Sequence, residues 1–233
     1  MKKIVFLALL LSLNFSIAQA QISRGTSLIG GSIGYNRSTN ESKYVGSVIP
    51  AGPNPIELTY QNFNVNPNAG YFIADNLAAG LSLGFGTTKE IRPYSESADP
   101  ARPNKLITKS SAYNVAPFLR YYYFPIESFG FYSQLSAGLN HQVTTTTFDE
   151  IDNERKSKTN GGGVSITPAL VFFPSHKLGL ELTAGSIGYS RTRTKPSSLQ
   201  EGQYDRETKT SSFGANFGLS TLTLGASYYI GRQ

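Results

Sequence analysis

The stretch NFNVNPNAGY, residues 62–71, places an asparagine at every second position and carbon-rich side chains between them. An alternation of period two is the signature of a β-strand whose two faces meet different environments. Asparagine is a poor strand former, so its face requires surroundings that offer hydrogen bonds to amides. One face carries Asn62, Asn64, Asn66 and Asn68, and the other carries Phe63, Val65, Pro67, Ala69 and Tyr71. The stretch therefore predicts a strand between a polar and an apolar medium.

The same alternation recurs along the whole chain. The clearest further examples are LAAGLSLGFGTT (77–88), YNVAPFLRYYYF (113–124), GFYSQLSAGLNHQ (130–142), VSITPALVFF (164–173) and LGLELTAG (178–185). Together with residues 25–36, 60–72 and 211–230 they predict eight strands. The apolar phase of the last segment switches between Leu219 and Leu222, which predicts a bulge there, and we expect a second bulge near Ser186. Pro67, Pro117 and Pro168 fall in mid-strand, where we also infer local bulges.

The connections between these strands alternate in length. Short turns have the sequences ADN, PIES and PSHK, whereas the other links are long and polar and span residues 38–58, 90–107, 148–160 and 192–210. Short periplasmic turns and long extracellular loops are typical of bacterial outer-membrane barrels. The pattern predicts an all-β fold: a closed antiparallel eight-stranded transmembrane β-barrel, an up-and-down meander with four long extracellular loops.

The charge distribution decides which face points outward. A water-exposed surface is about 25–35% charged, yet the eight segments contain only two charged residues, Arg120 and Glu181. We therefore expect the apolar face to meet lipid and the small polar residues to fill a polar lumen. The predicted lumen-lining polar residues are Asn62, Asn64, Asn66, Asn68, Asn114, Gln134 and Asn140.

Residues 1–20 have the features of a signal peptide. Lys2 and Lys3 precede an apolar run, and Ala18-Gln19-Ala20 is a small-residue cleavage site, so we expect cleavage after Ala20 and a barrel domain of residues 21–233. Removing the two lysines leaves 21 − 2 = 19 basic against 15 acidic residues. This small excess of positive charge does not indicate a nucleic-acid-binding surface. The absence of cysteine and the presence of only two histidines leave little for metal or cofactor chemistry. We expect no cofactor, no metal and no nucleic-acid partner.

Four stretches carry a family resemblance: the Ala20/Gln21 junction, GYFIADNLAAGLSLGFG (70–86), VAPFLRYYYFP (115–125) and TLGASYYIGRQ (223–233). The chain resembles the small outer-membrane β-barrel family common in Bacteroidetes and, more loosely, the OmpA/OmpX-like eight-stranded barrels. This resemblance implies location in the bacterial outer membrane. It also implies an assembly signal at Thr223, Gly225, Tyr228 and Ile230 that the barrel-assembly machinery reads. The tail departs from the pattern, because Gly231, Arg232 and Gln233 stand where an aromatic residue often ends such chains.

Arg120 and Glu181 should meet inside the barrel. They lie at similar depths on the fourth and seventh strands, which stand nearly opposite each other in a narrow ring of eight. Buried charges are normally paired, so we predict a luminal ion pair with a structural or a gating role.

Three other groups are candidate sites. His141 on the lipid face has no spaced serine or carboxylate beside it, so catalysis on lipids is not expected. FDEIDNERKSK (148–158) gathers Asp149, Glu150, Asp152 and Glu154, but the spacing is not that of a calcium loop and a solvated loop is favoured. The stretch RTRTK, with Arg191, Arg193 and Lys195, could either meet lipopolysaccharide phosphates or be ordinary solubilising charge.

The sequence therefore predicts a monomeric, non-enzymatic integral outer-membrane protein, with a structural or surface-interaction role through its extracellular loops. Its expected partners are outer-membrane lipid, lipopolysaccharide and, during biogenesis, the barrel-assembly machinery. The alternative is a narrow passive channel for water, ions or small solutes. A lipid-modifying enzyme is a remote third alternative, because the chain lacks its residues.

Overall fold

The computed structural model describes residues 21–43, 56–94, 104–148, 153–196 and 207–232, and the predicted signal peptide lies outside them. These residues form ten strands and one short 3-10 turn. The strands are β1 (Ser27–Ser42), β2 (Ile56–Ala74), β3 (Leu77–Tyr94), β4 (Asn104–Ile126), β5 (Phe129–Phe148), β6 (Asn153–Ser175), β7 (Leu178–Thr183), β8 (Gly185–Pro196), β9 (Thr208–Phe217) and β10 (Thr223–Ile230), with η1 at Leu219–Thr221. No helix in the described part of the chain is long and apolar enough to cross a membrane.

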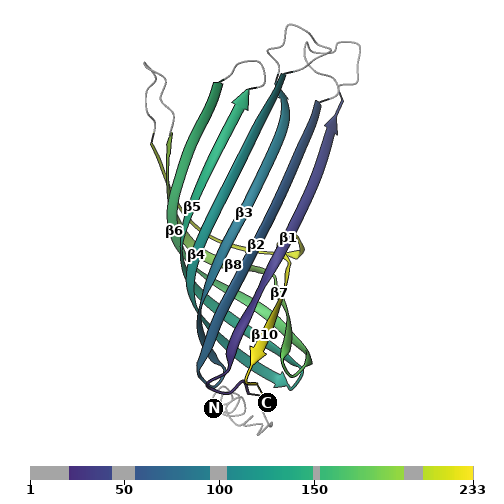
Figure 1. Cartoon of the computed structure of the whole chain (residues 1–233), viewed down its shortest axis with the longest axis vertical. Helices are drawn as coiled ribbons and strands as arrows, with labels where there is room; N and C mark the ends of the chain where they lie inside the picture. Colours follow the sequence, from purple (N-terminus) through teal and green to yellow (C-terminus); the bar gives the residue numbers. More distant parts are fainter. Residues whose placement is uncertain (1–20, 44–55, 95–103, 149–152, 197–206, 233) are drawn as a thin grey trace, which may run out of the picture.

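The strands form one antiparallel sheet that curves back on itself (Figure 1). Consecutive strands from β1 to β7 pair with each other, and β10 pairs with both β7 and β1. These pairings make a ring of eight strands at the end where both described termini lie. The antiparallel meander predicted from the alternation is therefore correct.

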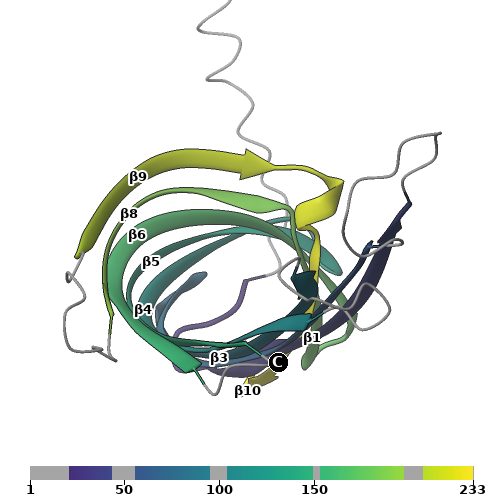
Figure 2. The same ribbon diagram turned by 90° about the horizontal axis from the view of Figure 1, so that it is seen from above.

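The outer half of the molecule differs from the predicted closed barrel. After β7 the chain turns at Gly185, which has φ +113°, and β8 pairs with β6 and β9. Strand β9 pairs with β8 alone, and Ser32–Ser42 of β1 pairs with β2 alone, among the residues described. The predicted seventh and eighth strands are thus each divided in two, at the positions near Ser186 and Leu219–Leu222 where bulges were expected. Only the inner half of the sheet is a ring, and the outer half is open between β1 and β9 (Figure 2).

The strands also extend beyond their predicted ends. The connections on the outer side shrink to residues 43–55, 95–103, 149–152 and 197–207, so most of the predicted loop at 148–160 is strand. These extensions are rich in threonine, serine and lysine, for example Thr144–Thr147 of β5. Where both faces of a strand meet water, the apolar alternation disappears, and the sequence pattern no longer marks the strand.

The outer face of the ring is apolar, as predicted from the low charge of its segments. Large outward side chains around the ring are between 44% and 58% exposed: Ile29, Tyr71, Leu81, Leu119, Tyr121, Leu135, Ile166, Leu180 and Tyr228. In water such a surface would be costly, whereas in hydrocarbon it is at its most favourable.

The interior changes character with depth, which corrects the prediction of a polar lumen throughout. Near the short turns the inward side chains form an apolar core rich in aromatic rings: Ile22, Leu28, Phe72, Ala78, Phe118, Tyr122, Phe124, Tyr132, Ala169, Val171, Phe173 and Tyr229. Small polar residues take over only above this layer. A ring of eight strands is just wide enough for side chains to fill, so the core closes the inner end.

The three mid-strand prolines do not cause bulges. The β2–β3 register is the same on both sides of Pro67, and the β4–β5 register is the same on both sides of Pro117. Each proline instead pairs with one neighbouring strand and leaves a local gap in the ladder to the other. Pro168 pairs with Ser133 and lies where β6 changes its partner from β8 to β7. The missing N–H is accommodated by omitting a pair of residues from the ladder.

Candidate functional site

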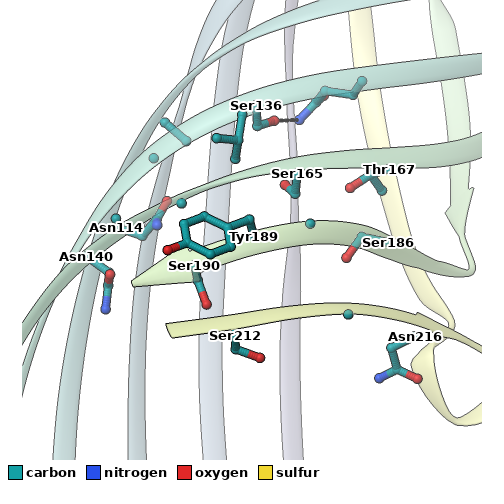
Figure 3. A pocket seen from close by; sticks show the side chains of 18 of the residues that line it. Asn114, Ser136, Asn140, Ser165, Thr167, Ser186, Tyr189, Ser190, Ser212 and Asn216 are labelled. Atoms are coloured by element: carbon teal, nitrogen blue, oxygen red, sulfur yellow. Dashed lines mark hydrogen bonds between the residues drawn. The ribbon is translucent and has the colours of Figure 1, made fainter. Parts of the chain in front are cut away.

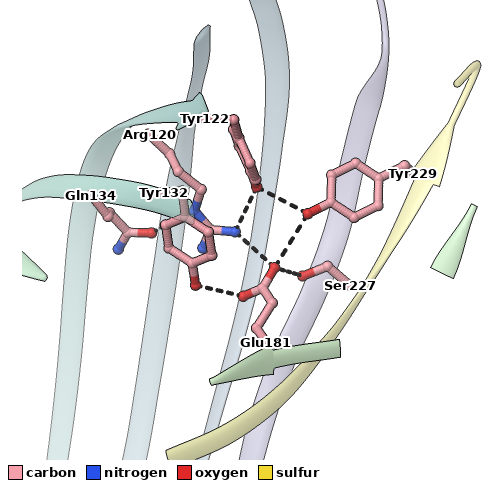
Figure 4. Close-up of polar contacts among 7 residues, drawn as sticks. All are labelled: Arg120, Tyr122, Tyr132, Gln134, Glu181, Ser227 and Tyr229. Atoms are coloured by element: carbon pink, nitrogen blue, oxygen red, sulfur yellow. Dashed lines mark hydrogen bonds and ion pairs between the residues drawn. The ribbon is translucent and has the colours of Figure 1, made fainter. Parts of the chain in front are cut away.

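A buried polar cluster lies on top of the apolar core. The structure brings Arg120 of β4 and Glu181 of β7 together, with 2.9 Å between Nη1 and Oε1, and their side chains are only 3% and 8% exposed (Figure 4). The two strands reach this contact from opposite parts of the ring, as their positions in the sequence predicted. Burying two charges is favourable only when each is also hydrogen bonded.

Hydrogen bonds satisfy both charges. Arg120 donates from Nε to Gln134 Oε1 (2.9 Å) and from Nη1 to the Tyr122 hydroxyl (3.0 Å). Glu181 accepts from the Tyr132 hydroxyl at Oε2 (2.8 Å) and from Ser227 at Oε1 (2.6 Å).

Aromatic groups complete the cluster. The Arg120 guanidinium lies 4.2 Å from the Tyr132 ring centroid, a cation–π contact. The Tyr229 hydroxyl is 3.0 Å from that of Tyr122 and donates a longer bond (3.4 Å) to Glu181. The sequence interpretation missed Tyr122, Tyr132, Ser227 and Tyr229 as members of the cluster. Their inward positions in the strand alternation are the signal that could have identified them.

The predicted asparagine row is a hydrogen-bonded ladder on the inner face of β2. Asn66 donates to Asn64 (3.2 Å), Asn64 donates to Asn62 (3.1 Å), and Asn62 donates to Thr88 of β3 (3.2 Å). Asn68 lies below them at the level of the cluster, and its Oδ1 is buried without a hydrogen-bond partner in the described structure. The ladder explains the composition of the opening sequence stretch, because Asn62 and Asn64 each donate and accept, and Asn66 donates to both Asn64 and Ser32.

Two contiguous cavities lie above the cluster. The larger has a volume of about 630 Å³, and its lining includes Asn114, Gln134, Asn140, Ser212 and Asn216 (Figure 3). The smaller, of about 140 Å³, lies inside the ring, is lined by residues of all eight ring strands and contacts Arg120 and Glu181. The two share Ser82, Gln134 and Thr167, so they form one space. The predicted lumen-lining residues Asn114, Gln134 and Asn140 therefore border a real cavity.

Ile22 and Arg232 cover the inner side of the core. The Ile22 side chain is fully buried, and its backbone N–H donates to Asn76 Oδ1 while its carbonyl accepts from the Asn76 N–H, both at 2.9 Å. The Arg232 guanidinium lies 3.6 Å from the Phe173 ring centroid. Burial lowers the pKa of Arg232. The tail residue that departs from the expected aromatic ending thus covers an aromatic surface instead.

The remaining candidate residues lie on the outer face or outside the described residues. His141 Nδ1 is 2.7 Å from Asn160 Oδ1 on the outward side of β5 and β6. Asp149, Glu150 and Asp152 fall outside the described residues, whereas Glu154, the fourth acidic residue of that group, lies in β6 with its Oε1 3.1 Å from Lys156 Nζ. No group of three His, Asp or Glu side chains in the described ranges could hold a metal ion.

The basic stretch of β8 forms part of a charged rim. Arg193 and Glu207 form an ion pair, and Lys195 and Lys209 lie 3.8 Å and 3.5 Å from the same carboxylate. The hydrogen bond from Arg193 lowers the pKa of Glu207. Among the described residues here, three cations thus share one anion.

The predicted assembly signal lies on β10. Tyr228 and Ile230 face outward and are 48% exposed, whereas Gly225 borders the smaller cavity. Both partners of β10 are ring strands, β1 and β7.

Comparison with known proteins gives structural neighbours only. No protein-family model matches the chain, and no curated protein matches it. A major outer membrane protein from Thermus thermophilus aligns with a TM-score of 0.42 and 13% identity, covering 88% of this chain and 98% of that one. The Yersinia pestis outer membrane protein Ail aligns at 17% identity, with TM-scores of 0.30 in a nanodisc structure and 0.29 in a crystal structure. The alignments cover 89% of this chain in both cases and 100% and 99% of Ail. Such low scores transfer no function.

Proposed function

We propose that the protein is a non-enzymatic integral protein of the bacterial outer membrane with a structural or surface-interaction role at its outer rim. The observation that carries the proposal is the apolar outer face of the ring, whose leucine, isoleucine and tyrosine side chains stand exposed. The ion pair and the aromatic core are buried inside the ring, whereas leucine side chains are exposed on its outer face. Such an exterior is favourable in contact with lipid hydrocarbon and costly in contact with water.

The closed inner end favours a structural role over the alternative of a passive channel. Water would have to pass the Arg120–Glu181 cluster and then the aromatic core capped by Ile22 and Arg232. Side chains in such cores pack at the density of organic crystals. We therefore assign the ion pair to holding β4 and β7 together across the ring.

The outer rim supports a proposed contact with lipopolysaccharide. Arg193, Lys195 and Lys209 face outward above the apolar band and are offset by Glu207 alone among their described contacts. Lys158 stands opposite Lys195 in the β6–β8 register, and Arg193 stands opposite Lys209 in the β8–β9 register. Like charges directly opposite each other destabilise a sheet, so an anionic partner such as a lipid phosphate would relieve this repulsion.

We further propose that the chain is monomeric and that Thr223, Gly225, Tyr228 and Ile230 of β10 act as its assembly signal. Strand β10 completes the ring by pairing with β1, so its insertion is the closing step of the inner half. Replacing Tyr228 and Ile230 with serine should reduce the amount of folded protein in outer-membrane fractions.

Two measurements test the membrane assignment and the channel alternative together. The purified protein should require detergent to stay monodisperse, and it should show no steady single-channel openings in a planar bilayer. Free solubility without detergent would contradict the membrane assignment. Steady conductance would contradict the structural role and support the passive-channel alternative.

A further inference from the structure

The outer half of the sheet has a lateral slot between β1 and β9. The β1–β10 ladder ends at Gly31 and Ala226, and beyond it Ser32–Ser42 and β9 have no strand on their facing edges within the described residues. From above, β1 and β9 stand on different sides of the opening (Figure 2). Such edges present rows of free backbone N–H and C=O groups.

The rim of the slot is apolar. Ile33 is 71% exposed, Phe213 is 74% exposed and Leu224 is 75% exposed. These three side chains are apolar and outward, so we infer that the slot begins at the depth of the apolar band.

Behind the slot lies the polar cavity. Ser212, Gly214 and Asn216 of β9 line its larger part, and Ser32 of β1 lines its smaller part. Its volume of about 630 Å³ is in the range of small-molecule sites, roughly 300–1,000 Å³. The residues that line the larger part carry no charge. The ion-pair cluster and the aromatic core close the space below, so it is a blind pocket with a side entrance.

We propose that this pocket binds a membrane amphiphile with an uncharged, hydroxyl-rich head group, such as a glycolipid, which enters through the slot. The head group lies among the serine and asparagine side chains, and its acyl chain leaves between Ile33, Phe213 and Leu224. Free backbone polar groups are costly at membrane depth, and the hydroxyls satisfy those on the two edges. The larger cavity offers no cation for a phosphate, so charged head groups bind less well.

This inference rests on the proposed membrane location, and nanodiscs provide the test. Octyl glucoside is the probe, and a phosphocholine of equal chain length is the comparison. Contacts are read as NMR cross-relaxation between sugar protons and the side-chain amides of Asn114, Asn140 and Asn216. Failure of the protein to enter nanodiscs would contradict the membrane location, whereas entry without these contacts overturns the inference alone.

A matched pair of variants separates the pocket from the apolar exterior. A Cβ added at Gly214 would have no atom within 4 Å, and Gly214 lines the cavity, so we expect the side chain of Gly214→Trp to occupy part of the pocket. Leu135→Trp adds the same group on the outward face of β5, away from the slot. Gly214→Trp should weaken glucoside binding by about tenfold or more, and Leu135→Trp should leave it unchanged.

Three further results would overturn the proposal. They are equal glucoside binding by both variants, equal contacts from the phosphocholine, and direct β1–β9 pairing in the nanodisc that closes the slot. Ser212→Trp also fills the cavity and replaces Gly214→Trp if the latter does not fold.

Discussion

At the scale of single residues, the molecule depends on how its two buried charges are satisfied. The contact between Arg120 and Glu181 follows from sequence alone, since strand alternation places both inside and their turns place both at one depth. The tyrosine hydroxyls around them do not follow. Alternation says that Tyr122 and Tyr132 point inward, but only the ring's curvature decides which hydroxyl reaches which charge.

Replacing Arg120 with alanine should destabilise the protein by about 3–5 kcal/mol, because Glu181 keeps its buried charge without a cation. Replacing both residues with leucine should cost clearly less than the sum of the two single changes. Chemical unfolding in detergent, followed by circular dichroism, measures all three. Arg191→Ala on the exposed rim is the control, and a loss from Arg120→Ala no larger than the control's would exclude the structural role.

At the scale of elements, the strands are continuous where the sequence alternates and divide where its phase changes. The phase switch at Leu219–Leu222 predicted a bulge, whereas the structure has a break between β9 and β10 that η1 occupies. The departure of β8 and β9 from the ring could not be predicted, because alternation fixes the faces of a strand but not its neighbour. The polar outer ends of the strands also escaped prediction, since both of their faces are hydrophilic.

Gly185 should be essential to the turn between β7 and β8. Its φ of +113° is unfavourable for other residues, and a Cβ there would overlap the Asn216 carbonyl. Gly185→Ala should therefore lower the free energy of unfolding by more than about 1 kcal/mol. Gly214→Ala, which meets open space, should change it little. Equal unfolding midpoints for the two variants would show that the turn carries no strain.

Amide hydrogen exchange should distinguish the edges from the ring. Along β9, the N–H groups that bond to β8 should exchange slowly and the alternate ones, on the free edge, quickly. Protection in β2, which has a neighbour on both sides, should be more uniform, with its exception at the ladder gap near Pro67. Uniform protection along β9 would indicate that a partner covers its edge.

At the scale of the whole molecule, the antiparallel meander and the outward apolar face were predictable, and the layered interior was not. Period-two alternation separates inside from outside. It does not predict which inward residues belong to the apolar core and which line the polar cavity above it, because Phe118 and Asn114 occupy the same face of one strand. Depth within the ring, which sequence pattern does not encode, decides between them.

Orientation can be tested with single cysteines, because the chain has none of its own. A membrane-impermeant maleimide added to intact cells should label Ser42→Cys at the outer end of β1. It should not label Glu127→Cys in the turn between β4 and β5, which lies at the opposite end. The reverse pattern would place the short turns at the cell surface.

Strands β4 and β6 are each 23 residues long, whereas about 9–11 residues suffice to cross a membrane. At roughly 3.3 Å per residue, each strand is much longer than the membrane is thick. Much of each strand therefore extends beyond the bilayer as rigid sheet. The backbone of this part of the sheet is hydrogen bonded, so changing its shape when a partner binds would cost free energy. For the proposed surface role, a molecule arriving from the medium would meet a platform whose form is already set, and its capture would forfeit little chain entropy.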